Sequence, residues 1–248
     1  NKVLCVFENV NESAKPYAVA GVVSSGSVTW GTAVQLGTFD VAGEFTIGVE
    51  FDASVGQFIA YAHNEGNTGQ FYRISISGTN TVNSTAYNFS DASMRTNGHT
   101  HMCLEGNGNG SYFFLDSGDG QKIKGVHISY TSSSLTQGSK VQISSNTSTH
   151  IASHGHFAFI PDQNKYIMSM RRDTSYDCYY HLISRSSSSY SIVAGAALQQ
   201  NSGNVQEGQL FSRGSEFLFV WRNSSNNLVA NAGKVRGTTI TSLANNQA

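Results

Sequence analysis

The sequence predicts an all-β fold made of repeated four-stranded units, and three observations support that prediction. Short runs in which apolar and polar residues alternate recur along the whole chain, as half-buried strands require. Five of these runs are similar and begin at Lys2, Gln57, Ser111, Lys165 and Glu216, so the steps between them are 55, 54, 54 and 51 residues. No stretch of helical length has a helical period. A period of about 50 residues with several strands inside it is typical of a β-propeller.

Each full unit is predicted to hold four antiparallel strands in the same order. The first strand is expected at 45–51, 99–104, 154–160 and 208–211, and a turn of Asp, Gly, Asn or Ser follows it. The repeated run is the second strand, and two further strands complete the unit. The predicted units are approximately 1–41, 42–96, 97–147, 148–201 and 202–248, which together form a single propeller domain over residues 1–248 of about five blades.

The first unit departs from this pattern. The chain opens on a run that corresponds to a second strand, so this unit holds only three predicted strands, at 3–8, 17–23 and 28–36. Either the fold is a five-bladed ring with one three-stranded blade, or the chain is truncated and blades are missing upstream of Asn1. The first residue is Asn rather than Met, which favours processing or a part of a longer chain. Both alternatives stay open.

Charge and hydropathy exclude several classes of partner. Only 12% of the residues are charged and the formal net charge is -1, so the basic stripe expected of a nucleic-acid-binding protein is absent from the sequence. No apolar run approaches the roughly 20 residues of a membrane-spanning helix, and no basic-then-apolar leader precedes the first strand. We therefore expect no nucleic-acid partner and no membrane insertion.

The sequence carries no recognised catalytic motif. Neither G-x-S-x-G nor H-E-x-x-H occurs, and Asp52, Asp116, Asp119 and Asp162 all fall in predicted turns, where Asp is favoured for its backbone hydrogen bonds. The three cysteines include no C-x-x-C pair, and each lies in an alternating run, so we expect them to be small buried apolar side chains. We predict a protein that is not an enzyme and needs no cofactor.

Four histidines form a candidate metal cluster. His99 and His101 are two residues apart on a predicted first strand, and His154 and His156 occupy the matching place 55 residues later. Residues i and i+2 of a strand share a face, and the first strand of each blade borders the central channel. The four imidazoles are therefore predicted to converge there, either as ligands for Zn, Ni or Cu or as groups that hydrogen-bond neighbouring blades or contact water in the channel.

Polar turns supply the candidate ligand-binding residues, because amide, hydroxyl and ring groups are what carbohydrate recognition uses. The predicted turns contribute Asn64 and Asn67 from one unit and Arg171, Arg172, Asp173 and Tyr176 from another. Trp30 and Trp221 lie inside predicted strands, so we expect both to pack between blades rather than to face a ligand.

The segments 24–34 (SSGSVTWGTAV) and 49–79 resemble the propeller repeats of bacteriophage tail and virion proteins. The resemblance is sharp in the first two units, with a closing Trp-Gly pair at Trp30, and covers the rest of the chain only as architecture. It implies a structural protein of a phage virion, on the tail or another exposed part, in contact with other virion proteins and with a host-surface glycan. Single sugar contacts are weak, so attachment of this kind also implies multiple copies per particle.

Two other functions remain open. One is a secreted propeller lectin that uses the same sugar-binding chemistry without a virion. The other is a propeller glycosidase, favoured by two segments, 24–30 and 115–123, that approach the Asp-box turn of sialidases without matching it. A glycosidase would need paired carboxylates facing one pocket.

Overall fold

The structure is a computed structural model, and its description covers thirteen segments of the chain: 1–41, 47–64, 69–78, 80–89, 96–116, 119, 122–143, 156–171, 178–187, 189–193, 198–200, 207–223 and 225–247. Within them, side chains are described except at 96–99, 115, 170–171, 178, 198–200, 207 and 244–247. The described residues form five antiparallel sheets that follow one another along the chain. Their number and strand order confirm the predicted repeat.

The first sheet contains β1 (Lys2–Asn9), β2 (Lys15–Ser24), β3 (Ser27–Trp30) and β4 (Val34–Gln35). β3 and β4 both pair with β2, so they occupy one strand position between them. The sheet therefore has three positions, as the sequence predicts, and β1 is its edge strand. The short 3₁₀ helix η1 (Val10–Glu12) connects β1 to β2.

The other four sheets each have four strand positions. The second contains β5 (Ile47–Asp52), β6 (Gln57–His63), β7 (Gly69–Ser77) and β8 (Thr81–Asn88). The third contains β9 (Thr96–Leu104), β10 (Asn109–Asp116), β11 (Lys122–Tyr130), β12 (Leu135–Gln137) and β13 (Val141–Gln142), with β12 and β13 both paired to β11.

The last two sheets repeat this plan. The fourth contains β14 (His156–Ile160), β15 (Lys165–Arg171), β16 (Cys178–Ser186), β17 (Ser189–Ile192) and β18 (Leu198–Gln200), and η3 (Pro161–Gln163) joins β14 to β15. The fifth contains β19 (Glu207–Arg213), β20 (Glu216–Arg222), β21 (Leu228–Arg236) and β22 (Thr239–Gln247). No helix of the described residues is long and apolar enough to cross a membrane.

Four hydrophobic clusters fill the junctions between successive sheets. Alternation puts one set of side chains of each strand into the junction before it and the other set into the junction after it. Tyr61 and Phe71 of the second sheet, for example, pack on Tyr112 and Phe114 of the third, and Tyr180 of the fourth packs on Phe217 of the fifth. Burying both faces explains why a chain of modest hydrophobic content uses so many aromatic side chains.

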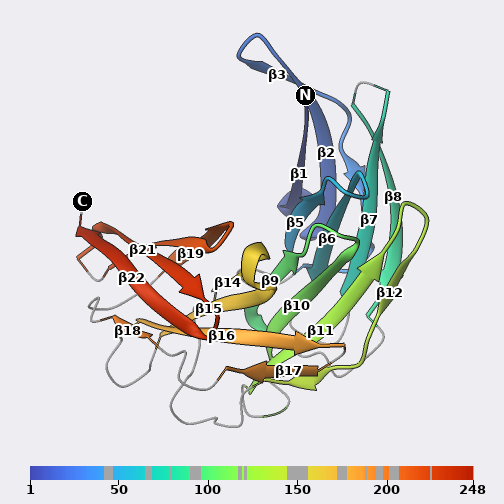
Figure 1. The fold of residues 1–248 in the computed structure, drawn as a ribbon. Coiled ribbons are helices and arrows are strands. Elements are labelled where there is room, and N and C mark those ends of the chain that lie inside the picture. The colour runs from blue at the N-terminus through green and yellow to red at the C-terminus, as the bar shows by residue number, and fades with distance from the viewer. Residues whose placement is uncertain are drawn as a thin grey trace.

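The first strands of the sheets are neighbours in space. β5 contacts β9, β9 contacts β14, and β14 contacts β19, so these strands line the inner side of the assembly. Figure 1 shows the five sheets along an open arc, with the first and last sheets apart at its two ends. The described structure therefore differs from a closed five-bladed ring, the first of the two alternatives that the sequence left open.

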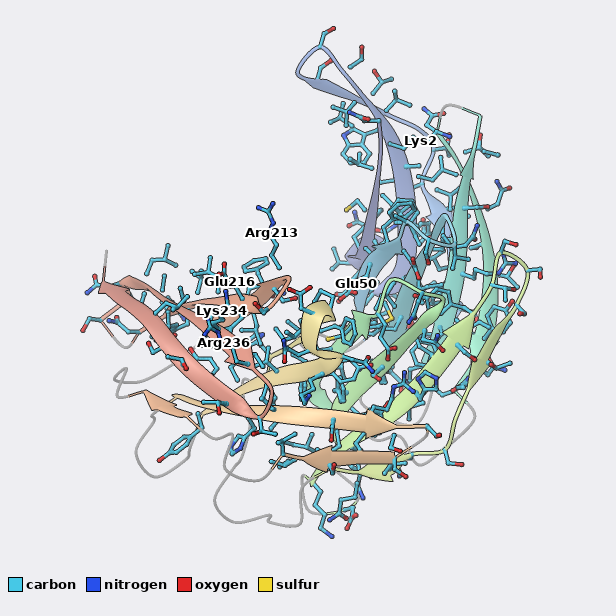
Figure 2. The ribbon with its side chains drawn as sticks, viewed as in Figure 1. Lys2, Glu50, Arg213, Glu216, Lys234 and Arg236 are labelled. Carbon is cyan, nitrogen blue, oxygen red and sulfur yellow. The ribbon has the colours of Figure 1, made fainter. Side chains whose placement is uncertain are left out.

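The outward face of the last sheet remains partly apolar. Phe211, Leu218 and Leu243 are 52%, 40% and 56% exposed, because no sheet of the described residues packs on them. Figure 2 shows Arg213 and Glu216 on the same sheet. A sheet of this repeat thus buries its second face only where another sheet follows it.

Candidate functional site

The predicted histidine cluster is partly within the described structure. His101 on β9 and His156 on β14 lie on adjacent inner strands, with ring centroids 6.2 Å apart and planes nearly perpendicular. Burial lowers the pKa of His101 to about 4, so its imidazole is neutral at physiological pH. The side chain of His99 and the whole of His154 lie outside the described residues. The structure therefore brings two of the four together, and metal binding by the quartet stays a prediction.

The predicted loop residues are mostly outside the described part of the chain. Asn64 follows β6, and its carbonyl oxygen lies 3.0 Å from Nδ1 of His63. The backbone of Arg171 ends β15, opposite Cys178, but its side chain is not among those described. Asn67, Arg172, Asp173 and Tyr176 lie outside the described residues altogether. Their role in ligand binding stays a prediction.

A groove between the first two sheets has the composition of a sugar site. It has a volume of about 480 Å³, within the usual range for small-molecule sites. Trp30, at the end of β3, is 49% exposed and forms part of the wall. The remaining described residues that line the groove come from the segment between β3 and β4, from the start of β4, and from the turn before β8 and its first two residues: Gly31, Thr32, Val34, Asn80, Thr81 and Val82.

The geometry of this groove depends on Gly31. Its amide donates to the carbonyl oxygen of Ala20 at 2.8 Å, which holds the chain against β2 just beyond Trp30. A Cβ at position 31 would lie 2.5 Å from the carbonyl oxygen of Asn80 and 2.8 Å from its Cγ. Glycine is therefore needed for the turn of the second sheet to approach the indole. The Trp-Gly pair thus has a structural reason: it exposes a ring and lets an amide side chain lie beside it.

In a second polar cluster, between the third and fourth sheets, the polar side chains hydrogen-bond to one another. Arg185 donates from Nε and Nη2 to the Glu105 carboxylate at 2.8–3.0 Å, and the Tyr166 hydroxyl donates to the same carboxylate. The Ser111 hydroxyl lies 2.7 Å and 2.8 Å from the hydroxyls of Tyr166 and Tyr190. Because these groups hydrogen-bond one another and the side chain of Glu105 is 2% exposed, the cluster joins two sheets and offers little to a ligand.

The sequence prediction for the tryptophans was half right. Trp221 is 2% exposed and stacks on Phe219 within the junction between the last two sheets, as expected. Trp30 was wrongly expected to pack between blades, since its ring lies over Gly21 of its own sheet and is 49% exposed. The alternation of a four-residue strand could not reveal this, because the outermost strand of a blade has no fixed burial on either face.

The cysteine prediction also needs a correction. Cys103 is 3% exposed, as expected, whereas Cys5 is exposed. Cys5 lies on β1, and no described sheet covers the outward face of that edge strand. The side chain of Cys178 is outside the described residues.

Comparison with known proteins defines the fold. The chain is similar to a protein from Lactobacillus plantarum (TM-score 0.62, 12% identity, 98% of this chain and 67% of that one). It is also similar to the BP39L lectin from Burkholderia pseudomallei (0.60, 12%, 96% and 64%) and to the fucose-specific lectin from Aleuria aurantia (0.58, 13%, 100% and 74%). The fold is a β-propeller. At these identities the likeness establishes the architecture and not the activity.

No family model matches the sequence, and no curated protein matches it significantly. The chain spans roughly two thirds of the length of the solved propellers it resembles. The resemblance to phage virion repeats finds no support among these structures and stays a prediction.

Proposed function

We propose that this β-propeller is a carbohydrate-binding protein without catalytic activity, a lectin that holds a sugar in the groove beside Trp30. The observation that carries this proposal is a half-exposed indole in a groove that Asn80, Thr32 and Thr81 also line. A pyranose presents an apolar C–H face that packs on such a ring. Its hydroxyls accept hydrogen bonds from amide and hydroxyl groups and donate hydrogen bonds to them.

Two further observations favour a lectin over the alternatives. Two of the similar solved propellers are described as lectins, one of them fucose-specific. The described residues that line the groove include no carboxylate, whereas glycoside hydrolysis requires a pair of them. The virion setting, with its host-surface glycan and its multiple copies per particle, stays a prediction, as does the alternative of a secreted lectin.

The test is a glycan array followed by titration calorimetry with the best-bound sugar. We expect the wild-type chain to bind weakly. Trp30→Ala should reduce the affinity about tenfold or more, because it removes the ring on which the sugar packs. A tenfold loss corresponds to about 1.4 kcal/mol of binding free energy. Gly31→Ala should weaken binding although Trp30 remains, since the added methyl group displaces the Asn80 turn.

Phe51→Ala is the matched control. Phe51 is a similarly exposed aromatic residue, 52% accessible, on β5 and outside the groove. Its replacement should leave sugar binding unchanged. The proposal is wrong if no glycan binds the wild-type protein, or if Phe51→Ala and Trp30→Ala reduce binding equally.

A further inference from the structure

Three different metal-binding side chains converge on the inner side of the arc. Glu50 comes from β5 of the second blade, and His101 and Cys103 come from β9 of the third. One carboxylate oxygen, one imidazole nitrogen and the Cys103 sulfur all lie within 4.8 Å of one another. His101 and Cys103 are two residues apart on one strand and therefore share a face. Figure 2 shows Glu50 on the concave side of the arc.

The Glu50 carboxylate is held in place but its charge is not compensated. Its Oε2 accepts a hydrogen bond of 2.8 Å from the amide of Leu104, which fixes the carboxylate against β9. Among the described residues, no Lys or Arg forms an ion pair with it. Burial accordingly raises the pKa of Glu50 to about 7, although the Leu104 hydrogen bond acts in the opposite direction. A cation at this point would favour the ionised form of this carboxylate.

The thiol of Cys103, next to Glu50, is also buried in surroundings that disfavour its ionised form. Cys103 is 3% exposed, and burial together with the nearby carboxylates raises its pKa well above the ordinary value. A thiol of this kind is a poor nucleophile, since reactivity follows the thiolate. A metal ion at this point would counter both effects, because a thiol that coordinates a metal ion is deprotonated outright.

The three donors face a cavity with room for a further ligand. The cavity has a volume of about 250 Å³ and is bounded by side chains of the four inner strands β5, β9, β14 and β19, including Phe157, Phe159 and Gln209. The free space is large enough for a bound water molecule.

We propose that Glu50, His101 and Cys103 form a binding site for one divalent metal ion of the Zn²⁺ class. Zn²⁺ takes sulfur, imidazole and carboxylate ligands together, at about 2.3, 2.0–2.1 and 2.0–2.2 Å, usually in a tetrahedron. Those bond lengths bring ligand atoms to about 3.3–3.7 Å from one another, so the donor atoms need to move inward by about 1 Å at most. Water from the cavity occupies the fourth position.

The ion would join the inner strands of two blades. Within each sheet the strands are hydrogen-bonded to one another, but β5 and β9 belong to different sheets. A metal ion with ligands from both strands links the second blade to the third, on the side of the arc that faces the axis. Metal binding should therefore stabilise the fold, because the ion binds the native arrangement and not the unfolded chain.

Cobalt spectroscopy provides the test, because Co²⁺ replaces Zn²⁺ and reports a bound thiolate through a sulfur-to-cobalt charge-transfer band. The full chain, reduced and freed of metal with a chelator, is titrated with Co²⁺ and then with Zn²⁺. We expect a charge-transfer band that saturates at one Co²⁺ per chain and disappears when Zn²⁺ displaces it. Thermal unfolding in Zn²⁺ should shift to higher temperature.

The variants separate this site from the histidine pair and from surface thiols. Cys103→Ser should abolish the band, and Glu50→Gln and His101→Gln should each weaken Co²⁺ binding by more than about 100-fold, since loss of a group that merely supports a ligand costs roughly 10–100-fold. Cys5→Ser is the matched control for the thiol and His127→Gln for the imidazole, because both residues lie outside the cavity. Both controls should bind like the wild type.

Three results would overturn the inference. The first is the absence of a charge-transfer band in the wild-type protein at stoichiometric Co²⁺. The second is a band that Cys5→Ser removes. The third is Co²⁺ binding that Cys103→Ser and Glu50→Gln leave intact, which would assign the metal to imidazoles alone. The wild-type titration decides the matter even if a variant fails to fold.

Discussion

Arg185 and Glu105 form a charge pair between the third and fourth blades. The guanidinium makes a bidentate contact with a carboxylate that is 2% exposed, and Tyr166 donates to the same carboxylate. Bidentate, shielded pairs of this kind resist screening, unlike pairs at the surface. The pair contributes to stability chiefly because Glu105 without Arg185 would be a buried carboxylate with no compensating charge.

Replacing Arg185 with Met should destabilise the protein by about 3 kcal/mol, since removing one partner of a buried pair typically costs 3–5 kcal/mol and Arg185 is partly accessible. Urea denaturation followed by circular dichroism measures the change. Lys234→Met is the control, because the Lys234–Glu216 pair is 30% and 58% exposed and should contribute less than about 1 kcal/mol. Equal losses in the two variants would contradict this interpretation.

Burial of His63 makes the stability of the protein depend on pH. The side chain is 1% exposed, with Nε2 at 3.4 Å from the Thr100 hydroxyl, and burial lowers its pKa to about 4 from 6.5. Between these two values the unfolded chain binds a proton that the folded chain does not. The contribution of His63 to stability is therefore constant above pH 6.5, falls as the pH decreases from 6.5 to about 4, and levels off below that.

His63→Gln should remove this contribution, which is on the order of 2–3 kcal/mol over the window. The measurement is the free energy of unfolding at several pH values between 4 and 7 for both proteins. We expect the curve of the variant to be flatter than that of the wild type in this range. Parallel curves would mean that His63 titrates normally in the folded state.

At the scale of single elements, aromatic rings lie over strand glycines and fix how neighbouring strands pack. A Cβ at Gly233 of β21 would lie 2.2 Å from the ring of Phe217, which stands on the paired strand β20. The ring therefore occupies the space that a side chain would need. The two strands can bring Phe217 into the core with Tyr180 only because position 233 is glycine.

Gly233→Ala should destabilise the fifth sheet by about 1–3 kcal/mol, the usual cost of overpacking a core. Gly138→Ala serves as the control, since a Cβ there would be 3.6 Å from its nearest neighbour, an ordinary contact. That change should stay within about 0.5 kcal/mol. Thermal or urea unfolding distinguishes the two, and a neutral Gly233→Ala would show that the ring can move aside.

The strands were predictable from the sequence where both faces of the strand are buried, or where one face is buried and the other is exposed. β20 alternates buried Phe217, Phe219 and Trp221 with more exposed residues, so its pattern and its boundaries were evident. Prediction failed at Trp30 and Cys5, which lie on the outermost position and on the edge strand of the first sheet. At these positions the burial of a side chain depends on whether another sheet lies against the strand. The alternation of apolar and polar residues along the strand does not show this.

The site in the inner cavity illustrates the same limit. The spacing of His101 and Cys103 is visible in the sequence, but Glu50 is about 50 residues earlier on a different strand. It joins them because β5 and β9 are neighbours at equivalent positions of successive blades. Only the register between blades, which no local pattern encodes, brings the carboxylate to the thiol.

For the whole molecule, the period determined the number of sheets but not the closure of the ring. Each unit of about 54 residues gives one blade because four strands and their turns require that length. The angle between blades depends instead on the side chains in each junction, such as the stacked rings of Phe113 and Phe157. The sequence therefore predicted five blades and left the shape of their assembly open.

The central claim is that the propeller holds a sugar against Trp30. The protein has only two tryptophans, and Trp221 is 2% exposed, so an ionic quencher in water reaches Trp30 alone. The decisive measurement is iodide quenching of tryptophan fluorescence with increasing concentrations of the sugar that the array selects. We expect the sugar to protect Trp30 from iodide in a saturable manner, at the concentration that calorimetry gives for binding. A sugar that binds while quenching stays unchanged would place the site elsewhere and contradict the claim.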